Sequence, residues 1–154
     1  MFIRILAILR KEREEKLLER ISHLGYAVTD IEAAAAFYRT SFGVEPGESE
    51  PVEEQGILAT MFRVGESSIE LVQPTRPDSP VGKFIARRGQ GFHHVAFEVR
   101  DLEASLAELK ARGVDLIDSE PRIGAGGMRM AFVHPHEVFG VLTELVESRG
   151  TGTH

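Results

Sequence analysis

The feature that most constrains this chain is an internal repeat. Residues 23–36 read HLGYAVTDIEAAAA, and residues 94–107 read HVAFEVRDLEASLA, so histidine, valine, aspartate and glutamate recur at one constant spacing. A second echo lies further along each copy, where IELV at residues 69–72 is answered by TELV at residues 143–146. A repeat of this kind predicts two copies of one supersecondary unit. Each copy begins with a histidine and ends with a glutamate.

The hydrophobic pattern predicts the same order of elements in both copies. Residues 22–28 and 92–99 alternate as half-buried strands. Asp30 and Asp101 then stand where a helix N-cap belongs, and the helices are expected to end near Gly43 and Gly113. Further strands are predicted at residues 57–64 and 67–72, and at 114–117, 129–133 and 141–146. The result is an α+β fold, βαβββ twice, with an antiparallel-type sheet in each half and a helix on one face.

At 154 residues the chain suits one compact domain. We expect the domain to span residues 21–148, with modules at about 21–74 and 91–148. A proline-containing linker and a short helix over residues 81–88 should join them. Residues 1–20 lie outside the repeat and are predicted to form a helical extension, and residues 149–154 a flexible tail. The apolar start of that extension needs a cover, which favours a homodimer.

Composition excludes several classes of function. The net charge of −6 argues against nucleic acid as a partner. No apolar run is long enough to cross a bilayer, and no signal peptide is recognisable, so we expect a soluble, cytoplasmic protein without a membrane partner. The chain has no cysteine, which rules out disulfides and thiolate metal ligands.

The repeated residues form a candidate metal site composed of His23, Glu70, His94 and Glu144. In a strand of period two, His23 shares a face with Gly25, and His94 with Ala96, so small neighbours leave room for an ion. The same alternation sends His93 to the opposite face, under the helix. Any one of the four ligand candidates would more commonly be a core histidine or a solvated glutamate. Their recurrence in register favours a metal such as Co²⁺, Mn²⁺, Ni²⁺ or Zn²⁺, with one or two open positions.

The pattern resembles the vicinal oxygen chelate superfamily and, within it, the methylmalonyl-CoA epimerases. The resemblance covers residues 21–147 and rests on these motifs: VEEQG (52–56), PDSP (77–80), GFHHVA (91–96), PRIGAGG (121–127), AFVHP (131–135) and GVLTEL (140–145). It implies paired βαβββ modules, a U-shaped mixed sheet around a metal with helices outside, and a homodimer. It also assigns the metal ligands to His23, Glu70, His94 and Glu144, and favours Co²⁺.

The resemblance implies epimerisation of the 2R and 2S forms of methylmalonyl-CoA through a metal-stabilised enolate. We expect Glu144 to act as one base, and Glu70, Glu53–Glu54 or a water as the other. The sequence departs from the family at Ala59, where some members carry a proposed second base, and at residues 136–139. Two alternatives are a glyoxalase I with the same ligand set and a metal-free drug-binding protein of the bleomycin-resistance type.

The contacts to coenzyme A are less constrained by the sequence. Lys83, Arg87 and Arg88 could meet its phosphates, although a solvated basic helix face is the plainer interpretation. The glycine-rich stretch 124–127 matches no nucleotide-binding motif, and we expect it to form a flexible rim beside the acyl group.

Overall fold

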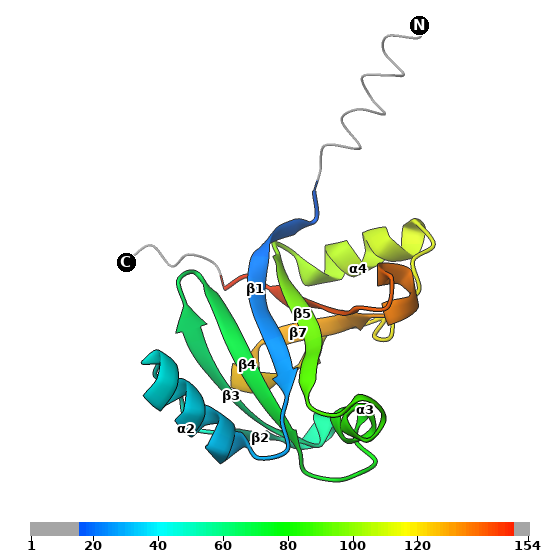
Figure 1. The fold of residues 1–154 in the computed structure, drawn as a ribbon. Coiled ribbons are helices and arrows are strands. Elements are labelled where there is room, and N and C mark those ends of the chain that lie inside the picture. Colours follow the sequence, from blue (N-terminus) through cyan, green and yellow to red (C-terminus); the bar gives the residue numbers. More distant parts are fainter. Residues whose placement is uncertain (1–15, 150–154) are drawn as a thin grey trace, which may run out of the picture.

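The computed structural model describes residues 16–149 as a single curled sheet with three α-helices outside it (Figure 1). The strands lie in the order β2-β3-β4-β1-β5-β8-β7-β6. Their bounds are β1 Leu18–Ala27, β2 Glu50–Val52, β3 Ile57–Val64, β4 Ser67–Pro74, β5 Gly91–Val99, β6 Arg122–Ile123, β7 Arg129–Val133 and β8 Leu142–Glu147. The helices are α2 Ile31–Phe42, α3 Pro80–Arg88 and α4 Leu102–Ala111, with 3-10 turns η1 Glu53–Gln55, η2 Ala125–Gly127 and η3 Pro135–Val138.

The two predicted βαβββ modules are confirmed. The first consists of β1, α2, β2, β3 and β4, the second of β5, α4, β6, β7 and β8, and α3 lies between them in sequence. The first and last strands of each module pair in parallel, β1 with β4 and β5 with β8, and the modules meet where β1 and β5 pair antiparallel. The sheet is therefore mixed, and the expectation of an antiparallel-type sheet in each half was wrong. In each module the helix lets the chain return and lay its last strand parallel to the first.

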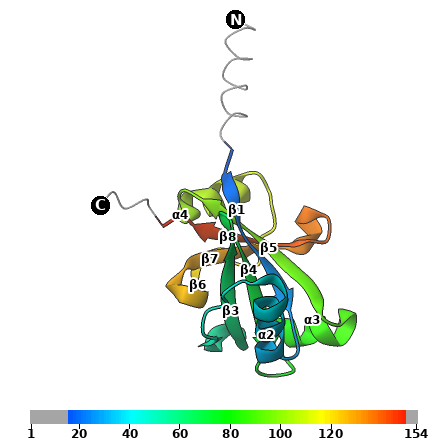
Figure 2. The same cartoon turned by 60° about the vertical axis from the view of Figure 1, so that its left-hand side comes forward.

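Helices α2 and α4 cover the outer face of the sheet (Figure 2). In α2, Ile31 and Ala35 are buried against Phe62 and Leu71. In α4, the buried residues Leu102 and Leu106 pack in a cluster with Val99, Ala131, Val133 and Leu145. Both predicted caps are present, since the Asp30 carboxylate accepts a hydrogen bond from the Ala33 N–H and Asp101 accepts one from Ala104, each at 3.0 Å. The covered outer face leaves the concave face for a ligand.

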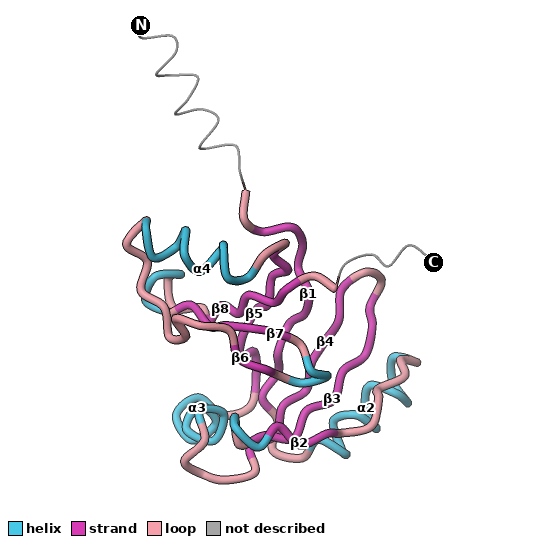
Figure 3. The backbone as a smooth tube through the Cα atoms, turned by 180° about the vertical axis from the view of Figure 1, so that it is seen from behind, coloured by secondary structure: helices cyan, strands magenta, loops and turns pink. Residues whose placement is uncertain are grey.

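Helix α3 lies beyond one end of the central strands (Figure 3). Its N-cap Ser79 accepts a hydrogen bond from the Gly82 N–H, and Pro80 opens the first turn, as the missing proline N–H allows. Val81 is buried in a cluster with Ala27, Ile57 and Val72. Ala27 shares the concave face with His23 and Gly25, so this cluster closes one end of the concavity with apolar side chains.

Two boundary predictions were wrong. Residues 18–20 belong to β1 rather than to a helical extension, and residues 1–15 lie outside the described part of the chain, as do residues 150–154 of the predicted tail. The strand expected at residues 114–117 is replaced by one isolated bridge between Leu116 and Val133. Backbone hydrogen bonds from Ile117 and Asp118 to the Phe132 carbonyl remain, but side chains take two of the other N–H groups. The Asp115 N–H donates to Glu137 and the Phe132 N–H to Asp118. Within residues 16–149, no helix has the length and apolar character needed to cross a membrane.

Candidate metal centre

Strand register brings the four sequence candidates to one place on the concave face. Gly25 of β1 pairs with Glu70 on one side and with His94 on the other. Ala96 of β5 pairs in the same way with His23 and Glu144. Residues paired directly across a ladder point to the same side of the sheet, so two short rows of side chains face inward. Each row has the smallest residue at its centre and a histidine and a glutamate on its flanks.

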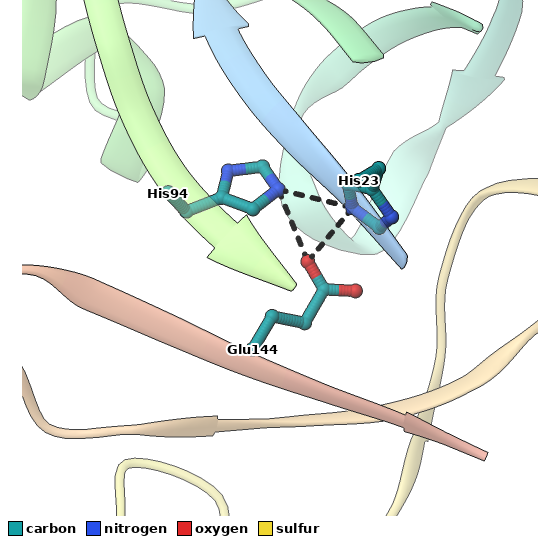
Figure 4. A group of neighbouring side chains, drawn as sticks. All are labelled: His23, His94 and Glu144. Atoms are coloured by element: carbon teal, nitrogen blue, oxygen red, sulfur yellow. Dashed lines mark hydrogen bonds and ion pairs between the residues drawn. The ribbon is translucent and has the colours of Figure 1, made fainter. Parts of the chain in front are cut away.

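The four side chains are buried and converge on one point. The two Nε2 atoms of His23 and His94 lie 3.3 Å apart. Glu144 Oε2 lies 3.4 Å from His23 Nε2 and 3.1 Å from His94 Nε2 (Figure 4). Glu70 Oε1 approaches the same nitrogen atoms at 3.9 Å and 3.4 Å. The four candidate ligands identified in the sequence therefore lie together in the folded protein.

The site is strongly polarised. Burial alone would lower the pKa of His94, but hydrogen bonds to Glu144 and Glu70 outweigh it and raise this pKa to about 9. Burial would raise the pKa of Glu144, and hydrogen bonds from His23 and His94 hold it at about 2 instead. In the metal-free protein a protonated imidazole therefore donates hydrogen bonds to these buried carboxylates. A cation could replace that proton.

The donor set suits a divalent metal ion. Nitrogen or oxygen atoms of His23, His94 and Glu144 all lie within 4.8 Å of one another, which is the spacing expected of ligands around one ion. Glu70 adds a second carboxylate close to both imidazoles. The two buried carboxylates face the imidazole nitrogen atoms directly, with no apolar group between them. A bound cation would stabilise these buried negative charges. The cluster is compatible with a divalent metal of the kind bound by histidine and carboxylate.

The predicted position of His93 was wrong, because a β-bulge interrupts the alternation of β5. Tyr26 pairs with Phe92 and Gly25 with His94, so His93 has no partner of its own on β1. The extra residue in such a bulge changes the direction in which its side chain points and shifts the two-residue alternation of the strand. His93 consequently lines the metal-site cavity instead of lying under α4, and its ring packs edge-on against Phe84 of α3.

Each site histidine is contacted by the residue directly before it. His93 Nδ1 lies 2.9 Å from His94 Nδ1, and Ser22 Oγ lies 3.1 Å from His23 Nδ1. Ser22 is also a bulge residue, since Ile21 pairs with Phe97 and His23 with Ala96. Partners on the far ring nitrogen fix the orientation of an imidazole and its tautomer, leaving Nε2 for the ion. Burial, followed by the charge of His94, lowers the pKa of His93 to about 4, so His93 is a neutral partner.

The two central positions are not equivalent. A Cβ atom on Gly25 would lie 2.0 Å from Cε1 of His94, far inside van der Waals contact. The His94 ring therefore occupies the space above Gly25. At the matching position in the second module, Ala96 is fully buried and its methyl group is accommodated. Glycine is required at position 25 for close packing.

Two cavities meet at this site. The smaller is lined by all of the cluster except His23, together with Gln55, His93, Phe132 and the loop residues Gly124 and Ala125. The larger, of about 610 Å³, shares Glu70 and Ala125 with it and extends along β3 towards the β3–β4 turn. A cavity of this size accommodates a cofactor-sized or drug-sized molecule. Gly124 and Ala125 of the glycine-rich loop thus line the site.

Several sequence candidates lie outside these cavities. Glu53 and Glu54 line neither cavity, whereas Glu48 and Glu50 line the larger one. Lys83, Arg87 and Arg88 line neither, and the larger cavity instead has three arginines at its wall, Arg20, Arg63 and Arg149. Sequence spacing gave no signal for these residues, since they come together from β1, β3 and the segment after β8.

Comparisons with known proteins agree with this geometry. Residues 22–132 match the model of the Glyoxalase/Bleomycin resistance protein/Dioxygenase superfamily. The chain is 36% identical over 132 residues to the mitochondrial methylmalonyl-CoA epimerase of Bos taurus, covering 85% of this chain and 75% of the relative. It is 36% identical over 131 residues to an ethylmalonyl-CoA/methylmalonyl-CoA epimerase of Cereibacter sphaeroides, covering 84% of this chain and 98% of the relative.

Solved structures give the same result. The chain superimposes with a TM-score of 0.82 and 42% identity on a methylmalonyl-CoA epimerase in complex with methylmalonyl-CoA and NH₄⁺, over 86% of this chain and 96% of that one. The methylmalonyl-CoA epimerase of Mycobacterium tuberculosis superimposes with a TM-score of 0.82 at 33% identity, over 88% and 94% of the two chains. The chain therefore belongs to the methylmalonyl-CoA epimerase family of the Glyoxalase/Bleomycin resistance protein/Dioxygenase superfamily.

Proposed function

We propose that the protein interconverts the 2R and 2S forms of methylmalonyl-CoA. The observation that carries this proposal is the buried cluster of two histidines and two glutamates on the concave face, beside a cavity of about 610 Å³. Relatives of 36% identity that cover most of the chain bear the name of this activity. The substrate carbon lies between a thioester and a carboxylate, so its proton is acidic enough for a carboxylate base.

We propose that His23, Glu70, His94 and Glu144 hold one divalent metal ion, with Co²⁺ favoured and Mn²⁺, Ni²⁺ or Zn²⁺ as alternatives. Two nitrogen and two carboxylate ligands with no thiolate suit these ions. When bound, the ion supplies positive charge that stabilises negative charge developing on the substrate oxygens. His93 and Ser22 orient the two imidazoles through their Nδ1 atoms.

Glu144 is our candidate for one proton-transfer base. It is buried and ionised, and its position on β8 faces the same concavity as the histidines. Glu70 is the matching carboxylate of the first module and is a candidate for the second base. A Glu70→Gln variant that keeps its metal and its full activity would exclude that role.

The reaction is tested in D₂O. Metal-loaded protein incubated with a single epimer of methylmalonyl-CoA should introduce deuterium at the α-carbon while the configuration inverts, followed by NMR and chiral analysis. Absence of exchange, with turnover of the methylglyoxal–glutathione adduct, would identify a glyoxalase I instead. Tight binding of an unrelated small molecule without metal would identify a sequestering protein.

We further propose a cytoplasmic homodimer acting on an acyl-CoA substrate, without nucleic acid or membrane as partners. The apolar residues at the start of the chain and the net charge of −6 support this assignment. Sedimentation at micromolar concentration should give twice the chain mass of 17.0 kDa, and a mass equal to one chain would contradict the dimer.

A further inference from the structure

Inversion at a carbon atom requires proton transfer on both of its faces. A single carboxylate that removes a proton and returns it from the same side restores the starting configuration. If the protein acts as proposed above, a second group must therefore face the substrate from the side opposite the metal-site carboxylate. The wall of the larger cavity contains the candidates, because this cavity adjoins the metal site at Glu70.

Strand register directs Glu50 into this cavity. Glu50 opens β2 and pairs directly with Ala59 of β3, and Ala59 pairs with Val72 of β4. Val72 lies two residues after Glu70, so Glu70, Ala59 and Glu50 all belong to the concave face. Both Glu50 and Ala59 line the larger cavity. Ala59 offers only a buried methyl group, so Glu50 is the residue of this strand pair that brings a carboxylate to the cavity.

The second module fixes the Glu50 carboxylate. The Gly126 N–H in η2 donates a hydrogen bond of 2.5 Å to Glu50 Oε1. Gly126 is held in turn, because its carbonyl accepts a hydrogen bond of 2.7 Å from Arg149 Nη2. Within residues 16–149, Glu50 Oε2 has no hydrogen-bond partner. One oxygen of this carboxylate is thus anchored and the other remains available to accept a proton.

Glu70 also lines this cavity, but it lies beside both imidazoles on the same side as Glu144, as a proposed metal ligand. The remaining carboxylates on the cavity wall are less suitable. Glu98 forms an ion pair with Arg20 at 2.8 Å, which occupies its carboxylate. Glu66 lies in the turn between β3 and β4, at the far end of the cavity from the loop residue Ala125. Glu48 lines the wall but precedes β2 and has no strand partner that would direct it inward.

We propose that Glu50 is the second proton-transfer base, facing Glu144 across the substrate. For one epimer, a Glu50 oxygen takes the α-proton, and the electron pair of the broken C–H bond moves onto the thioester oxygen to give an enolate. The enolate carbon then takes a proton from the acid form of Glu144 on the opposite face. This turnover leaves the proton on Glu50 and the charge on Glu144, which is the form that acts on the other epimer with the two roles exchanged. Proton exchange with solvent interconverts the two forms, so protons and charge balance in both directions.

The test treats the two epimers separately. Metal-loaded wild type, Glu50→Gln and the control Glu45→Gln are each incubated with pure 2R or pure 2S substrate in D₂O. Glu45 is an exposed glutamate ahead of β2 that lines neither cavity. Glu50→Gln should slow inversion by about 10²- to 10⁴-fold, the usual effect of losing a positioned base. It should still introduce deuterium into one epimer, whose proton faces Glu144, and lose exchange from the other. Glu45→Gln should exchange and invert both epimers like the wild type.

Three outcomes would overturn the assignment. The first is inversion by Glu50→Gln at the wild-type rate. The second is equal loss of exchange from both epimers, a result that would assign Glu50 to holding the η2 loop. Thermal unfolding and metal content, measured on the same samples, identify that structural case. Single-epimer exchange in Glu70→Gln with its metal retained would assign the base to Glu70. Wild type that exchanges neither epimer would instead refute the proposed function itself.

Discussion

The two modules share a backbone plan but contribute unequally to the proposed metal site. In the first, His23 is contacted by a serine, and the central residue is Gly25, with no side chain. In the second, His94 is contacted by another histidine, and the central residue is Ala96. Glu144 also approaches both imidazoles more closely than Glu70 does. The duplicated register sets where four side chains meet, and single residues beside them set how tightly each is held.

The largest expected effect follows from removing a ligand in either module. His94→Ala and His23→Ala should each lose the bound metal, because a buried site with fewer donors no longer offsets the cost of dehydrating the ion. Co²⁺ retained after dialysis, measured by elemental analysis, should fall from one equivalent to none. Retention of a full equivalent by either variant would contradict a shared site.

A control is needed for metal bound elsewhere. Asp115, His134 and His136 form a second, more exposed group with ligand atoms within 4.8 Å. His136→Ala removes that group without touching the concave face. It should leave the stoichiometry of tightly bound metal unchanged, and any loss there would show that the exposed group contributes to the count.

The next effect separates the central residues of the two rows. Gly25→Ala would place a methyl group 2.0 Å from the His94 ring, so the ring must move away from the ion. We expect metal affinity to fall by at least about 100-fold, comparable with or beyond the loss of a supporting partner. Ala96→Gly is the matched reverse change. It should keep the metal and cost only about 0.5–1 kcal/mol of stability.

Equal metal affinity in Gly25→Ala and wild type, determined by competition with a chelator, would mean that His94 has room to move. The same titration on Ala96→Gly shows whether a change at the centre of either row is sufficient to weaken the site. Only the first variant is expected to do so.

The bulge residues offer a finer comparison. His93→Ala should weaken metal binding by roughly 10- to 100-fold, the usual effect of losing an outer partner of a ligand histidine. Ser22→Ala should act in the same direction but more weakly, because its hydroxyl contact to His23 is longer, 3.1 Å against 2.9 Å. Isothermal titration with Co²⁺ ranks the variants. A larger loss of metal affinity in Ser22→Ala than in His93→Ala would contradict this order.

The smallest effect is a pH dependence of stability in the metal-free protein, and it tests whether His94 is protonated there. Hydrogen bonds to Glu144 and Glu70, acting against burial, raise the pKa of His94 to about 9, above about 6.5 in an unfolded chain. A raised pKa stabilises the folded state fully below the unfolded value. That contribution, at most on the order of 3 kcal/mol, is lost as pH rises from about 6.5 to about 9.

Thermal melts of chelator-treated protein across this range should therefore show a falling Tm. His94→Asn should flatten this slope, whereas His136→Asn should not. Glu144 acts at the other end, since its pKa of about 2 gives a contribution that is lost as pH falls from about 4.5 towards 2. A metal-free protein whose Tm rises between pH 6.5 and 9 would contradict the protonation of His94.

Much of the site could be predicted from the sequence because duplication supplies an internal comparison. His23, Glu70, His94 and Glu144 recur in register, and strand periodicity alone indicates that each pair faces one side. The helix caps at Asp30 and Asp101 were equally readable, because capping depends on residues within one turn. Local interactions of this kind leave a signal at fixed spacing.

The remaining features depended on contacts between segments far apart in sequence. The bulge at His93 is invisible in the sequence, because it exists only in the register of β5 against β1. Glu50 lay in a stretch predicted to be a polar loop, and its position on the concave face depends on pairing with Ala59. Its anchor, Gly126, comes from the other module. The sequence by itself thus determined which residues can act as ligands and which fold brings them together. The tertiary structure decided which neighbouring residues orient these ligands, because pairing between distant segments leaves no periodic pattern along the chain.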